Sequence, residues 1–371
     1  MSIQSTARRI YYDIQISNYV SSNTPPPILR FTETRTIPYL TNPQDYSLSI
    51  IRFQIDTPSL PVFTPEIAVN QPDPNLTIYS ITLEYQGHIC QQFMEFYPQD
   101  ISIDEPPPPS PLADNSAGYY NVFSYQYVIE LVNTTFTRVF NALTTAVGAG
   151  NMPTTNAPFL SWDSTNNIAI LNTDSVGFAS DGTLIEIYFN NAMFNIFSSF
   201  LAIYQGFNVL QGMNKLITIS NNQAGSNTIQ LPIDNNPQTP TYTAIQMSQE
   251  YTTISLWNPI SSIVFTSNTM PIVPSNLGNP LLFYDSSLNI GQSSGANYSQ
   301  IITDMVANDS YKPSLVCEPY YPREIDMIGN GELRTIDINC FYKSKLGVLQ
   351  PFILNSGCSA SLKLMFSRRE N

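Results

Sequence analysis

The sequence predicts an all-β protein: a jelly-roll barrel or sandwich of antiparallel strands, with an inserted region that carries one or two amphipathic helices. The first observation is a large number of short segments rich in β-branched and aromatic residues, more than the roughly eight strands that a jelly roll needs. The second is one long segment of helical periodicity in the middle of the chain. The third is a pair of expected strands, at 47–55 and 262–266, that are each followed by spaced prolines.

The expected strands are separated by Gly, Pro, Asn and Ser clusters, which is typical of turns. Gly87 and His88 lie between two of the strands and predict a hairpin turn. The segments with strand composition are 9–19, 47–55, 76–86, 89–97, 167–172, 183–190, 215–221, 228–233, 252–257, 262–266, 333–343 and 359–367.

Two segments in the middle third break the strand pattern. Residues Tyr125–Val147 place apolar side chains at helical spacing, and Gly148 ends the predicted helix. Residues 191–204 predict a second, shorter helix. The proline run Asp104–Pro111 cannot join a sheet interior and reads as a stiff spacer. The simplest expectation is that the longer helix covers one face of a sheet.

These features suggest a division of the chain into three parts. We expect the N-terminal strands of the jelly roll in residues 1–105, a linker and helix-containing insertion in 106–215, and the strands that complete the roll in 216–371. One compact unit is the alternative, since a single β-sandwich of this length is permitted.

Charged residues make up only 12% of the chain, while aromatic residues also make up 12% and prolines number 29. A charge-poor and aromatic-rich surface is typical of proteins that bury surface against neighbours, although an ordinary polar β-protein remains the alternative. The formal net charge of −13 argues against specific nucleic-acid binding, which needs a basic patch. The basic pairs at Arg8–Arg9 and Arg368–Arg369 read as solvated ends of the chain.

Targeting and redox features are few. Residues 1–9 are polar, which predicts no signal peptide, and no uninterrupted apolar run of about 18 residues predicts a membrane span. Four unclustered cysteines match no zinc spacing and suit a reducing compartment. We therefore expect a protein made inside a cell, without a cofactor or metal.

No catalytic constellation stands out. His88 is the only histidine, and Cys90 two residues along a strand would be about 7 Å away, too far for a nucleophile–base hydrogen bond. The turn at Gly329–Gly331 lacks the Lys-Ser/Thr of a phosphate loop. We therefore do not expect an enzyme. The sequence leaves open one catalytic arrangement, a glycosidase-like pair of carboxylates. The candidates for such a pair are Glu84, Glu95, Asp104, Glu105, Glu324 and Asp326.

Two proline-bearing arms, the first at Thr57–Thr64 and the second at Thr269–Pro274, share one pattern of strand, threonine, hydrophobe, proline and hydrophobe. Because proline pre-orders an extended arm, docking it on a neighbour costs less entropy. The alternative is that both arms cap the end of their own barrel. The assembly-contact candidates are Thr57, Pro58, Leu60, Pro61, Phe63, Met270, Pro271 and Val273.

Segments along nearly the whole chain resemble one family of viral proteins. They are Asn42–Phe53, Thr57–Phe63, Ser124–Asn133, Pro158–Asp163, Ile187–Asn190, Phe197–Phe200, Ser262–Pro274, Arg323–Arg334 and Gly357–Phe366. The sequence resembles the pentons, or minor capsid proteins, of virophages and polinton-like viruses. The resemblance implies a jelly-roll subunit of the virion that forms homopentamers at the five-fold vertices of an icosahedral capsid. It also implies contact with trimers of a double jelly-roll major capsid protein, and a host receptor as a further possible partner.

Two other functions compete with a vertex subunit. The strand-and-proline pattern of residues 49–63 recurs in residues 262–274. A duplicated roll would also produce this repeat, as in a double jelly-roll major capsid protein that forms trimers. The aromatic-rich loops would also suit a carbohydrate-binding or carbohydrate-active β-sandwich.

Overall fold

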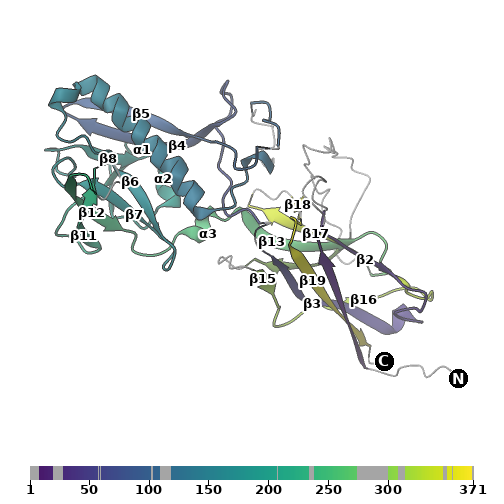
Figure 1. Cartoon of the computed structure of the whole chain (residues 1–371). Coiled ribbons are helices and arrows are strands. Elements are labelled where there is room, and N and C mark those ends of the chain that lie inside the picture. The colour runs from purple at the N-terminus through teal and green to yellow at the C-terminus, as the bar shows by residue number, and fades with distance from the viewer. Residues whose placement is uncertain are drawn as a thin grey trace. The chain divides into compact units, whose positions relative to one another are not determined.

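The computed structural model describes residues 8–19, 28–56, 58, 60–101, 103–108, 118–206, 208–233, 238–273, 300–307, 314–345, 349–352 and 354–369. The chain forms two compact units, labelled by element in Figure 1. Unit 1 consists of residues 1–61 and 259–371, and unit 2 consists of residues 62–258. Unit 2 is therefore an insertion between two strands of unit 1, β3 (Tyr46–Asp56) and β13 (Ile260–Ser267).

The insertion is wider than the 106–215 segment expected from the sequence. Strands β4 (Leu76–Tyr85) and β5 (His88–Glu95) form a hairpin, and β4 also pairs with β8 (Glu186–Phe189). Similarly, β12 (Thr241–Ser248) pairs with β7 (Ile168–Asp174). The proline run suggested a boundary, but strands on both sides of it pair with each other, and that pairing decides where the unit begins.

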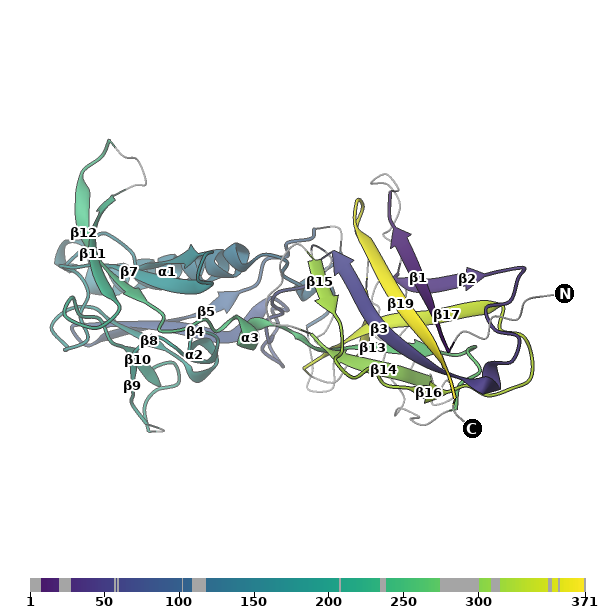
Figure 2. The same ribbon diagram turned by 90° about the horizontal axis from the view of Figure 1, so that it is seen from below.

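Unit 1 is an antiparallel sandwich of two five-stranded sheets, seen from a second direction in Figure 2. This arrangement confirms the jelly-roll expectation. The first sheet has the order β1 (Arg9–Ser17), β19 (Ser359–Arg368), β3 and β15 (Ser314–Cys317), with β16 (Ile325–Asp326) also paired to β3. The second has the order β14 (Gln300–Val306), β13, β17 (Thr335–Ser344) and β18 (Leu349–Pro351), with β2 (Arg30–Thr34) also paired to β17.

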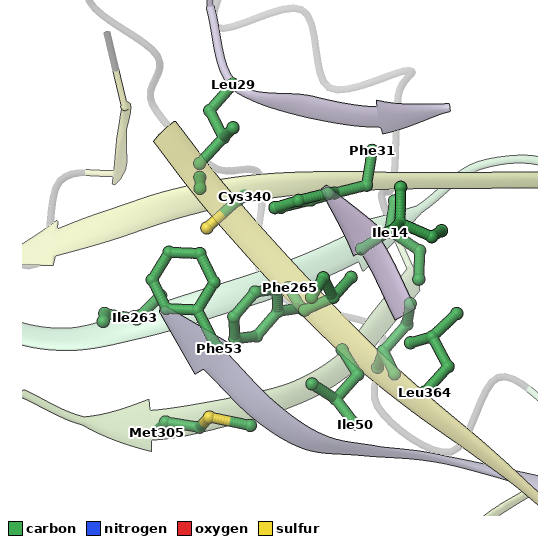
Figure 3. Packing of buried hydrophobic residues seen from close by; sticks show 14 of the residues in the cluster. Ile14, Leu29, Phe31, Ile50, Phe53, Ile263, Phe265, Met305, Cys340 and Leu364 are labelled. Atoms are coloured by element: carbon green, nitrogen blue, oxygen red, sulfur yellow. The ribbon is translucent and has the colours of Figure 1, made fainter. Parts of the chain in front are cut away.

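Aliphatic and aromatic side chains together fill the space between these two sheets (Figure 3). The Phe53 ring of β3 contacts the Phe265 ring of β13 edge to face at 5.2 Å. Phe53 also contacts Phe31 at 6.4 Å and Phe352 at 5.9 Å, and all four rings are fully buried. The repeated sequence pattern thus comes from two facing strands of one sandwich, and a duplicated roll is not supported.

Unit 2 contains two further antiparallel sheets. One has the order β5, β4, β8, β10 (Lys215–Ile217) and β9 (Ala202–Tyr204), and the other has the order β11 (Ser226–Pro232), β12, β7 and β6 (Phe159–Asp163). The predicted helix is confirmed as α1 (Tyr125–Val147), which packs against β4, β5 and β6 through an apolar stripe that includes Val132, Phe136 and Val139.

Two expectations for unit 2 are wrong in part. The predicted strand at 252–257 is a helical turn, α3 (Ile254–Trp257), because Thr253 Oγ1 and Trp257 Nε1 both donate to the Ile196 carbonyl, at 2.7 and 2.5 Å. The helix expected over 191–204 ends early as α2 (Asn191–Ile196), and the chain continues into β9.

The hairpin turn lies one residue before the expected position, at Gln86 and Gly87, and both residues have positive φ (50° and 77°). This is the conformation that a two-residue hairpin favours. Short 3-10 helices complete the elements, at Pro43–Asp45, Gly118–Tyr120 and Ala149–Asn151.

The substitution Phe53→Ala is expected to lower the unfolding free energy of unit 1 by about 3–5 kcal/mol, because it opens a cavity among buried rings. Chemical denaturation followed by circular dichroism measures this loss. Both tryptophans, Trp162 and Trp257, lie in unit 2, so their fluorescence serves as an internal control that should change little. A loss no larger than that of the exposed control Tyr11→Ala would contradict the packing described here.

Candidate assembly surface

The thiol and imidazole that could have suggested catalysis do not form a reactive pair. His88 begins β5 with an exposed side chain, and Cys90 is half-buried in the same strand. Burial raises the pKa of the Cys90 thiol, which disfavours the thiolate that a nucleophile requires. Among the described residues, no three His, Cys, Asp or Glu side chains are grouped so that they could hold a metal ion.

The carboxylates on the β4–β5 hairpin are engaged by neighbouring side chains. Glu84 lies directly opposite Glu186 across two paired strands, and the Tyr188 hydroxyl lies 3.2 Å from the former and 2.6 Å from the latter. Burial, followed by the hydrogen bond to Glu186, raises the pKa of Tyr188. Glu95 forms an ion pair with Arg138 at 2.5 Å. These pairings explain the carboxylates as parts of the sheet surface.

The second carboxylate pair lies in unit 1, at strand β16. Ser47 Oγ lies 3.5 Å from Glu324, and Asp326 pairs with Arg369 at 3.3 Å. Neither arrangement resembles two carboxyl groups across a sugar-binding cleft.

The first proline arm directs most of its side chains inward. Leu60 belongs to the buried core of unit 1, and Pro61 is buried as well. Phe63 is buried in unit 2, where its ring contacts Tyr79 at 6.0 Å and Trp257 at 6.5 Å. Pro58 is exposed, and its carbonyl accepts a hydrogen bond from Asn355 Nδ2 at 3.4 Å. Thr57 lies outside the described residues.

The second arm is fixed to the segment that contains β16. The Val273 amide donates to the Asp326 carbonyl and the Ile328 amide donates to the Pro271 carbonyl, both at 2.8 Å. Met270 is buried in the same core cluster as Leu60, and Pro271 is half-buried. Val273 is exposed.

The structure therefore brings Leu60 and Met270 together in one core, as expected if each arm caps its own barrel. It places Phe63 in the other unit. Pro58 and Val273 keep exposed surface, and a role for them in contacts with a neighbouring subunit stays a prediction.

Among the described residues of unit 1, a pair of tyrosines has the most exposed aromatic side chains. Tyr320 and Tyr321 are 88% and 85% exposed, and their rings contact edge to face at 4.7 Å. They lie between β15 and β16, the two short strands that pair along one side of β3. Sequence reasoning missed them, although Pro319 and Pro322 bracket them in the same way that prolines punctuate the two arms.

The other edge of the same sheet has a different surface. Strand β1 pairs with β19 on one side, and its exposed face carries Tyr11. The Lys363 ammonium lies 5.8 Å from the centre of the Tyr11 ring. One sheet of unit 1 thus ends in the tyrosine pair at one edge and in β1 at the other.

A buried carboxylate holds the base of the second arm. Asp337 on β17 is 3% exposed, accepts two hydrogen bonds from Arg30 (2.7 and 2.9 Å) and accepts one from Thr32 Oγ1 at 3.0 Å. Thr269 Oγ1 lies 3.4 Å away. The hydrogen bond from Arg30 lowers the pKa of Asp337, with a smaller contribution from Thr32.

Comparison with known proteins shows the family of this chain. The family model of the Sputnik minor capsid protein V18/19 matches residues 10–368. The chain belongs to this family. Two Sputnik virophage proteins are related in sequence: the uncharacterized protein V18 is 33% identical over 40% of this chain and 89% of its own length. The structural protein V19 is 28% identical over 50% of this chain and 83% of its own length.

Solved structures agree with this assignment. A chain in the cryo-EM structure of the Sputnik virophage superimposes with a TM-score of 0.78 at 26% identity, over 98% of both chains. The mavirus penton protein has a TM-score of 0.63 at 15% identity, over 98% of this chain and all of its own, and shows a shared fold.

This minor capsid protein is a structural component of the virion, and it is not an enzyme. Neither a duplicated major capsid roll nor a carbohydrate-active sandwich is supported by these relatives. In the described part of the chain, no helix is both long enough and apolar enough to cross a membrane.

The variant Asp337→Asn is expected to lower the unfolding free energy of unit 1 by about 1–2 kcal/mol at neutral pH, because Arg30 loses its charged partner. A carboxylate whose pKa is lowered by folding stabilises the protein above its unfolded pKa of about 4, and this contribution disappears as the pH falls through the folded pKa. The difference between wild type and variant should therefore shrink below about pH 4. Denaturation curves measured across pH test this, and a constant difference would contradict it.

Proposed function

We propose that this minor capsid protein is the penton capsomer, a homopentamer at the five-fold vertices of an icosahedral capsid. In this role unit 1 would contact its own copies and the surrounding trimers of a double jelly-roll major capsid protein. The proposal is supported by the family assignment and by the fold shared with the mavirus penton protein.

The observation that carries the proposal is the asymmetry of the first sheet of unit 1. A ring requires a head-to-tail contact, in which one surface of a subunit binds a different surface of the next. The sheet offers two such surfaces, the Tyr320–Tyr321 pair beside β15 and β16 at one edge and strand β1 at the other. Exposed tyrosines are favourable anchors for such a contact because they bury much area at low entropic cost.

The charge of unit 1 is compatible with contacts between copies. Residues 1–61 and 259–371 contain 13 acidic and 13 basic residues. Two neighbouring copies of unit 1 therefore carry no net repulsion, and each offers cations to the other's carboxylates.

Native mass spectrometry of the full chain tests the ring directly. We expect a species of five chain masses that persists on dilution into the micromolar range. A trimer would favour a major-capsid type of assembly instead, and a monomer at all concentrations and salt conditions would remove the proposal.

The double variant Tyr320→Ser with Tyr321→Ser is expected to raise the concentration at which the pentamer dissociates by more than about tenfold, since central aromatic anchors contribute about 2 kcal/mol or more per contact. Analytical ultracentrifugation measures the shift. The control, Val176→Ser with Tyr251→Ser, removes two exposed apolar side chains from unit 2 and should leave the dissociation unchanged. Equal effects of both variants would exclude the tyrosine edge as the contact.

A further inference from the structure

The entire net charge of the protein lies in unit 2. Of the 28 acidic and 15 basic residues in the chain, 15 acidic and only two basic residues fall within 62–258, which gives this unit a formal charge of −13. Unit 1 contains the remaining 13 of each sign and is neutral. A charge so far from zero on one unit creates a field that attracts cations and repels anions.

Both basic side chains of unit 2 are already engaged within the unit. Arg138 pairs with Glu95 and lies 3.2 Å from Gln92 Oε1. The Lys215 ammonium lies over two aromatic rings, 4.9 Å from the centre of Phe194 and 4.4 Å from that of Tyr204. A contact between two copies of unit 2 would therefore set carboxylates against carboxylates without cations to offset them, which disfavours a second copy as the partner.

Exposed apolar side chains and carboxylates occur together in the segments before β4, after β5 and before α1, which we call the acidic face. Its apolar centre consists of Tyr97, Ile101 and Phe123, and Ile101 is 90% exposed. Its rim consists of the exposed carboxylates Asp73, Asp104 and Glu105. An apolar centre inside a polar rim is the usual anatomy of a protein-binding surface.

Hydrogen bonds hold the segments of the acidic face together. The Phe123 amide donates to Gln99 Oε1 at 2.8 Å, and the Tyr127 hydroxyl donates to the Tyr97 carbonyl at 2.9 Å. These bonds attach the stretch that follows β5 to the start of α1. The Tyr97 hydroxyl donates to Glu95 at 3.1 Å, which fixes an aromatic ring beside a carboxylate.

The charge of Asp73 acts on both Tyr97 and Tyr119, and the charge of Glu105 acts on Tyr119. Burial raises the pKa of Tyr97, and the nearby charges of Glu95 and Asp73 add to this effect. Burial likewise raises the pKa of Tyr119, with added effects of Glu105 and Asp73. The Tyr119 hydroxyl donates to Asn75 at 3.0 Å, close to Asp73 in the chain. Asp73 and Glu105 therefore both lie near Tyr119.

We propose that the acidic face is a docking surface for a protein segment rich in lysine and arginine that carries an apolar anchor. Charge complementarity selects such a partner and excludes nucleic acids and anionic glycans. The exposed ring of Tyr97 adds a surface on which a lysine or arginine side chain can lie. The docking surface belongs to unit 2 alone and does not depend on the number of copies in the capsomer.

Fluorescence anisotropy with the full chain tests the proposal. The probe is a labelled synthetic peptide in which lysines surround one tryptophan and one leucine, and the control probe has glutamate in place of every lysine. One variant combines Asp73→Asn, Asp104→Asn and Glu105→Gln on the acidic face. The matched control combines Asp163→Asn, Asp181→Asn and Glu250→Gln, which removes the same charge from other parts of unit 2. A third variant, Ile101→Ser, removes the apolar centre.

We expect the lysine probe to bind and the glutamate probe not to bind. The variant on the acidic face should raise the Kd by about tenfold and the matched control by less than about twofold, because only nearby charges escape screening by salt. Ile101→Ser should raise the Kd by about threefold or more without moving the unfolding midpoint, since this side chain is exposed. Equal weakening by both charge variants, an unchanged Kd for Ile101→Ser, or no binding of the lysine probe would each overturn the proposal.

Discussion

The contact between Phe53 and Phe265 is the interaction on which the rest of the molecule depends. It joins β3 to β13 across the core of unit 1, and these are also the strands between which the chain leaves for unit 2 and returns. Because the two strands lie in opposite sheets, closing the sandwich also fixes the two ends of the insertion. The burial of these rings thus determines both the shape of unit 1 and the points from which the second unit begins.

Local patterns predicted the elements whose stability is itself local. The helix at Tyr125–Val147 was predictable to the residue, since its apolar stripe and the following Gly148 are both visible in the sequence. The segment at 252–257 was not, because its conformation is set by hydrogen bonds to Ile196, more than fifty residues away. The limits of the insertion were hidden for the same reason, since they depend on pairing between β4 and β8.

The candidate contact residues show a similar limit. The spaced prolines predicted extended arms, but they do not indicate which side chains of an arm face inward. Leu60 and Met270 are buried, while Pro58 and Val273 remain at the surface. The tyrosine pair at 320–321 lies outside both arms and outside the expected strands, and only the pairing of the short strands β15 and β16 with β3 places it at a sheet edge.

Because unit 2 is inserted between two strands, the strand pairs of unit 1 use no residue of the insertion. The chain passes between the units only twice, next to Pro61 and next to Pro259. Mutations in residues 62–258 can alter charge and surface without removing a strand from either sheet of unit 1. Substitutions in the two units can therefore accumulate at different rates.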